Sequence, residues 1–104
     1  NDEFNDIIKS GKYLRNHFYN IYYKDGNNDY PKFGLAVSKK FGTAVERNKI
    51  KRQLRTLIAH NKNLFSKRHN YIIMVRGGVK DLTYQEMEIQ LVQLLEKGKF
   101  NEKN

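Results

Sequence analysis

The chain has 104 residues, with 20 lysines and arginines against 11 aspartates and glutamates, so its formal net charge at pH 7 is +9. This length fits one domain, residues 1–104, and the absence of cysteine excludes a disulfide framework and a thiolate zinc site. The longest apolar run, 71–75, is far shorter than the roughly 20 residues of a membrane-spanning helix. We therefore expect a soluble, cytoplasmic protein with no membrane partner, and the basic excess predicts a polyanionic one.

The first third of the chain predicts one helix and two strands. Apolar residues at helical spacing, followed by Gly11, indicate a helix over residues 3–10. Side chains alternate with a period of two over residues 13–23, which predicts a strand with aromatic residues on both faces. A second strand is expected over residues 33–38, and we expect the two strands to pair as a hairpin.

The middle of the chain predicts a long helix. Thr43 and Glu46 have the spacing of a capping box, in which each side chain bonds the backbone of the other residue. Apolar residues at intervals of three and four extend the helical pattern to about His60. The stripe expected to pack in the core consists of Ile50, Leu54, Leu57 and Ile58.

The last third predicts a strand and a second long helix. The continuous apolar run at 71–75 indicates a strand buried on both faces. A second capping box, Thr83 with Glu86, precedes an amphipathic helix that should end near Gly98, and we expect residues 99–104 to form a frayed tail. Together the elements predict an α/β (α+β) two-layer sandwich of helices on a small mixed sheet.

The positive charge is concentrated in one stretch. Seven basic side chains lie between residues 39 and 55 against a single acid, Glu46, so about one sixth of the chain carries about two thirds of the net charge. An ordinary solvated helix face would carry compensating acids at i±4 spacing. This focused charge favours a binding surface.

Helical periodicity separates these cations from the core stripe. Asn48, Lys51, Arg52 and Arg55 are spaced i, i+3, i+4, i+7 and form a second stripe about a third of a turn away. Guanidinium forks bind phosphate oxygens in pairs, and lysines act as point charges. We interpret the stripe as a nucleic-acid surface, since a membrane-surface helix would need exposed apolar residues that the core uses here.

The sequence predicts no catalytic residue and no metal ligand. His17, His60 and His69 lie on three different predicted segments, without a neighbouring carboxylate pair or a metal-binding spacing. We interpret them as ordinary surface histidines.

The basic stretch resembles the signature of the bacterial ribonuclease P protein subunit. The resemblance runs through 34–40, 42–45, 47–52 and Arg55, and it continues to the helix start at 82–86. An asparagine is often found in the family where Thr43 stands, and an arginine is common where Lys49 stands. Both replacements keep the capping or charge role.

This resemblance implies a function and a set of partners. The chain would be one monomeric protein per ribonuclease P RNA, assisting removal of the 5′ leader from precursor tRNA, with hydrolysis performed by the RNA and Mg²⁺ held mainly by RNA. The residues expected to bind the RNA subunit are Lys39, Lys40, Arg47, Asn48, Lys49, Lys51, Arg52 and Arg55. Those expected to bind the single-stranded leader, in a cleft between the first helix and the sheet, are Phe4, Ile8, Phe18 and Tyr22.

The resemblance also implies an unusual topology. Parallel strands joined through a helix cross right-handed in about 98% of cases, whereas this family has a left-handed crossover. We expect the order α-β-β-β-α-β-α, with one very short strand.

Two other functions remain open at the level of the sequence. A structural RNA-binding protein of ribosomal type could use the same basic helix without a leader cleft. A DNA-binding protein could place the helix in a major groove, but a strand is predicted where a helix-turn-helix motif needs its first helix.

Overall fold

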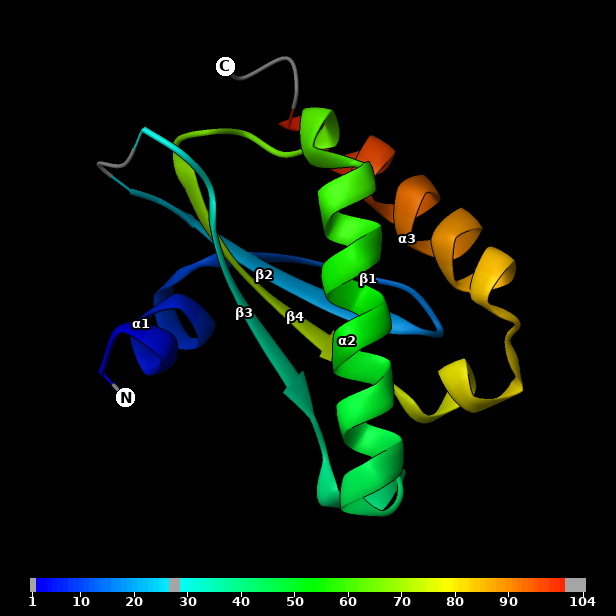
Figure 1. The fold of residues 1–104 in the computed structure, drawn as a ribbon. Helices are drawn as coiled ribbons and strands as arrows, with labels where there is room; N and C mark the ends of the chain where they lie inside the picture. The colour runs from blue at the N-terminus through cyan, green and yellow to red at the C-terminus, as the bar shows by residue number, and fades with distance from the viewer. Residues whose placement is uncertain (1, 27–28, 101–104) are drawn as a thin grey trace.

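The computed structural model describes residues 2–26 and 29–100, which form three helices and a four-stranded sheet (Figure 1). Three short 3₁₀ turns, η1, η2 and η3, connect them. The predicted order α-β-β-β-α-β-α is confirmed. The elements are α1 (Asp2–Ser10), β1 (Lys12–Arg15), β2 (Tyr19–Asp25), β3 (Lys32–Val37), η1 (Lys39–Phe41), α2 (Ala44–His60), η2 (Lys62–Leu64), β4 (His69–Val75), η3 (Gly77–Asp81) and α3 (Tyr84–Gly98).

The sheet has the strand order β1-β2-β4-β3, with β4 antiparallel to β2 and parallel to β3. The expected hairpin between the strands at 13–23 and 33–38 is therefore wrong, because β4 lies between them. The physical reason lies in β4, whose residues Tyr71, Ile72 and Ile73 are at most 1% exposed. A strand this apolar is stable only with a neighbour along each edge and cover on both faces.

The segment at 13–23 forms two strands rather than one. Asn16 interrupts it, and its side-chain oxygen accepts hydrogen bonds from the backbone N–H groups of Phe18 and Tyr19, both at 2.8 Å. This side-chain turn replaces the strand ladder and folds β1 back against β2 in an antiparallel pair. β1 is the very short strand of the expected order.

The connection from β3 through α2 to β4 is left-handed. In Figure 1, α2 lies in front of the sheet, both strands point downward, and β3 lies to the left of β4. With the helix toward the viewer, a right-handed connection would place the second strand on the other side of the first. The left-handed crossover expected from the resemblance is confirmed.

The main core fills the space between one sheet face and the two long helices. Both predicted capping boxes are present, at Thr43 and at Thr83, and each starts its helix at the next residue. The predicted apolar stripe of α2 faces the sheet: Leu54, Leu57 and Ile58 are buried, and Ile50 is half-buried. α3 adds Met87, Leu91, Leu94 and Leu95.

α1 lies on the opposite face of the sheet. Phe33 and Leu35 of β3 pack against the core, so Gly34 between them faces the other way, and the Phe4 ring lies 3.4 Å from where a Cβ on Gly34 would stand. An ion pair of 2.6 Å between Lys24 Nζ and Asp6 Oδ2 ties α1 to β2. α1 therefore covers part of this face and leaves the rest open.

The prediction that residues 99–104 form a frayed tail is wrong for Phe100. Phe100 is fully buried, and its ring packs edge-on against Tyr23 and Tyr71, with ring centroids 4.7 and 5.2 Å away. Lys99 adopts a left-handed backbone with φ 51°, which turns the chain back toward the sheet. A Cβ on Gly98 would lie 2.5 Å from the Phe100 ring, so glycine makes room for it. Residues 101–104 lie outside the described residues.

Phe100→Ala should therefore destabilise the chain. The expected loss in the free energy of unfolding is about 3–5 kcal/mol, because the substitution leaves a cavity among the rings of Tyr23, His69 and Tyr71. Urea denaturation measures it, and Ile89→Ala, at a side chain that is 52% exposed on α3, is the control expected within about 0.5 kcal/mol of the parent. If Phe100→Ala lost no more free energy of unfolding than the control variant, the packing of Phe100 described here would be contradicted.

Candidate nucleic-acid interface

The amino end of α2 is fixed by local bonds. Thr43 Oγ1 accepts from the N–H of Glu46, and Glu46 Oε1 accepts from the N–H of Thr43 at 3.0 Å. A Cβ on Gly42 would lie 2.7 Å from the Glu46 carboxylate, so glycine keeps space for this cap. Upstream, Ser38 caps η1 and leaves Lys39 and Lys40 exposed. The cationic segment therefore enters α2 in one defined geometry.

Four of the predicted RNA-binding residues share one side of α2. Asn48, Arg52 and Arg55 are exposed, and Lys51 is half-buried beside them. Lys51 and Arg55 border a groove of about 320 Å³ between α2 and β3, which fixes the direction of the stripe toward the outer edge of the sheet. We call these four residues the basic row. The structure brings them together as the helical spacing predicted.

The acidic side chains that the structure describes do not neutralise the basic row. Within residues 2–26 and 29–100, none of its cations forms an ion pair with a carboxylate. Glu46, the single acid of the stretch, is occupied by the helix cap, and the Thr43 backbone N–H that donates to its carboxylate holds the pKa of Glu46 below its ordinary value. The positive field of the row is therefore available to a ligand.

Two predicted RNA-binding residues of α2 point elsewhere. Lys49 borders a separate cavity of about 340 Å³ between α2 and α3, near Phe41 and Lys80. Arg47 lies one turn before Ile50 and two turns before Leu54, and it is half-buried at the margin of the core. Their roles stay predictions, but they are not part of the basic row.

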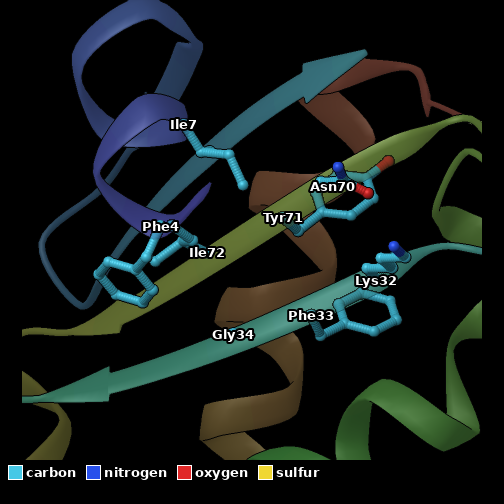
Figure 2. Close-up of a pocket in the computed structure, with 8 residues that line it drawn as sticks. All are labelled: Phe4, Ile7, Lys32, Phe33, Gly34, Asn70, Tyr71 and Ile72. Carbon is cyan, nitrogen blue, oxygen red and sulfur yellow. The ribbon is translucent and has the colours of Figure 1, made fainter. Parts of the chain in front are cut away.

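A second candidate surface lies where α1 crosses the sheet. Phe4 and Ile7 of α1 line a pocket of about 220 Å³ together with residues of β3 and β4. Figure 2 shows how these side chains lie around it. Lys32 and Asn70 supply polar groups at this pocket. No pattern in the sequence pointed to Ile7, Lys32 and Asn70 as site residues, because their convergence depends on β3 lying beside β4.

The predicted leader-binding residues are only partly brought together. Phe4 borders the pocket, and Ile8 is half-buried on the same helix. Tyr22 stands opposite Ile72 on the open face, with its ring 5.9 Å from that of Tyr13. Phe18 lies apart, half-buried against the core, where a Cβ on Gly78 would be 3.1 Å from its ring.

The histidine prediction needs one correction. His17 and His60 are exposed as expected, but His69 is 6% exposed. Its Nε2 lies 3.1 Å from Asp25 Oδ1, and its ring stacks on Tyr71. The strand begins at His69, two residues before the apolar run, so that its first residue faces the core.

The described part of the chain offers neither a metal cluster nor a membrane span. Over residues 2–26 and 29–100, no group of three histidines, aspartates or glutamates is placed to hold a metal ion. In the same residues, no helix combines the length and the apolar character needed to cross a bilayer. The element ahead of α2 is β3 followed by one 3₁₀ turn, so α2 is not the second helix of a helix-turn-helix.

Comparison with known proteins gives a consistent result. Residues 1–99 match the family model described as Ribonuclease P. The chain is 40% identical to the ribonuclease P protein component of Mycoplasma mycoides, over 95% of this chain and 92% of that protein. It is 36% identical to that of Streptococcus pyogenes, over 92% and 85% of the two chains.

Solved structures agree with the sequence relatives. The ribonuclease P protein of Staphylococcus aureus superposes with a TM-score of 0.88 at 32% identity, covering 96% of this chain and 92% of that one. The protein from Thermotoga maritima gives a TM-score of 0.85 at 28% identity, covering 91% and 90%.

Glu46→Gln separates the charge of the cap from its hydrogen bonds. Because the pKa of Glu46 is lowered in the folded chain, its ionised form stabilises the fold above its ordinary pKa of 4.5, and this stabilisation is lost as the pH falls through the folded pKa. Glutamine can cap but cannot ionise. The parent should be the more stable protein at pH 7, and the difference should shrink toward about pH 3 in urea denaturation. A difference independent of pH would contradict this account.

Proposed function

The chain belongs to the ribonuclease P protein family, and we propose that it binds ribonuclease P RNA through its basic row and assists removal of the 5′ leader from precursor tRNA. Membership of this family makes it a protein component of the ribonuclease P endoribonuclease and implies partnership with the RNA subunit. Which surface of the chain binds the RNA subunit and which binds the leader is our proposal. One observation carries it: a row of cations on one side of α2 that no carboxylate of the described residues neutralises.

The composition of the row suits a folded RNA backbone. Arg52 and Arg55 are exposed one turn apart, and each guanidinium can bind two phosphate oxygens at once. Asn48 can both donate and accept hydrogen bonds, so it can pair with a ribose hydroxyl or a base edge. Lys39 and Lys40 on η1 extend the positive surface beyond the amino end of α2.

The face between α1 and the sheet is the proposed site for the 5′ leader. Phe4 and Tyr22 present partly exposed aromatic rings there, and Lys32 brings a positive charge to the adjoining pocket. Aromatic rings stack on unpaired bases of any identity, contributing about 1–3 kcal/mol per base. Such a site would accept leaders of many sequences, as a general tRNA-processing enzyme requires.

Bond cleavage is assigned to the RNA. In this proposal the chain positions RNA and leader, and Mg²⁺ is held mainly by phosphates of the RNA and the substrate, where it would stabilise the charge that develops during cleavage. The protein contributes cations and stacking surfaces, and no residue of this chain is assigned an acid or base role. One monomer would serve each RNA, in the cytoplasm, where precursor tRNA is available.

Arg52→Ala and Arg55→Ala should weaken binding to ribonuclease P RNA without affecting folding. With about five phosphate contacts, affinity should fall roughly 10²–10³-fold between about 50 and 200 mM salt, and each substitution should lower the slope of log affinity against log salt by about 1. Filter binding measures the affinity. Lys97→Ala, an exposed lysine on α3, is the matched control. A variant that unfolds, or a parent with a flat salt response, would contradict the assignment.

Tyr22→Ala should act on the leader alone. Its expected effect is about a 5-fold or greater loss of affinity of the assembled holoenzyme for precursor tRNA carrying a leader, with little change for tRNA without one. Tyr84→Ala on α3, where the side chain is 37% exposed, is the control. Equal losses for both substrates would remove Tyr22 from the leader site.

A further inference from the structure

An apolar trough runs along the outer edge of β3, and it extends from the basic row to residues that have no role above. The groove between α2 and β3 has an apolar floor that includes Leu35, Ile58 and Ala59. A second cavity, of about 590 Å³, continues it past η2 toward the segment before β3. Phe33 and Lys62 line both cavities, so the two form one surface, which we call the β3 trough.

The trough carries positive charge along its whole length. Lys51 and Arg55 border one end, Lys62 lies at the junction, and Lys67 lies at the far end. Among the described residues that line it, Asp29 is the only acid. The row of cations that starts on α2 therefore continues without a break onto the segment between α2 and β4.

The far end of the trough presents an aromatic ring to solvent. Tyr30 lines the second cavity and is 65% exposed, the largest exposed fraction of any tyrosine in the described residues. β3 is also an edge strand, because β4 is its only partner within residues 2–26 and 29–100. Its second row of backbone N–H and C=O groups faces outward along the trough and can bond a ligand.

We propose that the β3 trough binds an unpaired strand of ribonuclease P RNA, with Lys62 and Lys67 on its phosphates and Tyr30 stacked on a base. This inference rests on the proposed function and extends it to residues outside the basic row. A duplex offers only its backbone at such a surface, whereas an unpaired strand also offers base faces, which match an apolar floor and an exposed ring. Continuity with Lys51 and Arg55 favours the RNA subunit over the leader, whose proposed site lies on the other face of the sheet.

Tyr30→Ala tests the stacking contact. It should weaken binding of the full chain to ribonuclease P RNA, in the absence of precursor tRNA, by about 5- to 100-fold. Tyr30→Phe should retain the affinity, because the ring suffices. Tyr13→Ala is the matched control: this side chain is 58% exposed on β1, at the opposite edge of the sheet. Equal affinities for Tyr30→Ala and Tyr13→Ala would overturn the proposal.

Lys62→Ala and Lys67→Ala test the phosphate contacts. Each should lower the slope of log affinity against log salt by about 0.7, the value for single strands. Lys12→Ala, an exposed lysine on β1, should leave the slope unchanged. If both trough variants have the same slope as Lys12→Ala while Arg52→Ala still lowers affinity, the trough proposal is rejected and the proposed function stands. If Arg52→Ala has no effect on affinity either, the proposed function is itself rejected, and the trough proposal with it.

A photocrosslink identifies the occupant. Benzoylphenylalanine in place of Ala59, which is exposed at the groove, should crosslink to a nucleotide of the RNA subunit that is unpaired in its secondary structure. The reaction is run on the holoenzyme with leader-bearing precursor tRNA present. A crosslink to the leader, or to a base-paired nucleotide of the RNA subunit, would overturn the proposal.

Discussion

The burial of β4 on every side determines the rest of the architecture. Tyr71, Ile72 and Ile73 cannot remain in water, so β2 and β3 pair along the two edges, and helices cover both faces. Because β3 and β4 are parallel, the chain between them must cross the sheet, and α2 is that crossing. The position of β4 thereby brings the cations of α2 to the outer edge of β3.

The sequence predicted the features that depend on neighbouring residues, such as the helix starts. It did not predict the features that depend on contacts between distant residues, such as strand pairing. Both long helices begin where Thr43 and Thr83 cap them, because a capping box is complete within four residues. The pairing of β2 with β4 is a contact between segments about fifty residues apart, and alternation alone cannot specify it. The burial of Phe100 was not predicted for the same reason. Its neighbours in the sequence are polar, and its ring packs against two strands that are distant in the sequence.

The residues of the candidate site also divide into those that local spacing predicted and those that only the fold brings together. Helical periodicity placed the basic row correctly, because the spacing of residues along a helix fixes their angles. The same periodicity separates Lys49 from the row, although the family resemblance grouped them. Neither rule could place Ile7, Lys32 and Asn70 in one pocket, since that required the positions of α1, β3 and β4 relative to one another. No sequence pattern pointed to Tyr30, and our proposal for it rests on its exposed side chain in the structure.

The edge position of β3 has a consequence for the protein before it meets RNA. An exposed strand edge invites a second copy of the chain to pair with it, which is a common route to aggregation. Lys51, Arg55 and Lys62 stand beside this edge, so two copies approaching in that way would bring like charges together. The cations that we propose to bind RNA would therefore also oppose the pairing of two copies along this edge, and a bound nucleic acid would remove that opposition.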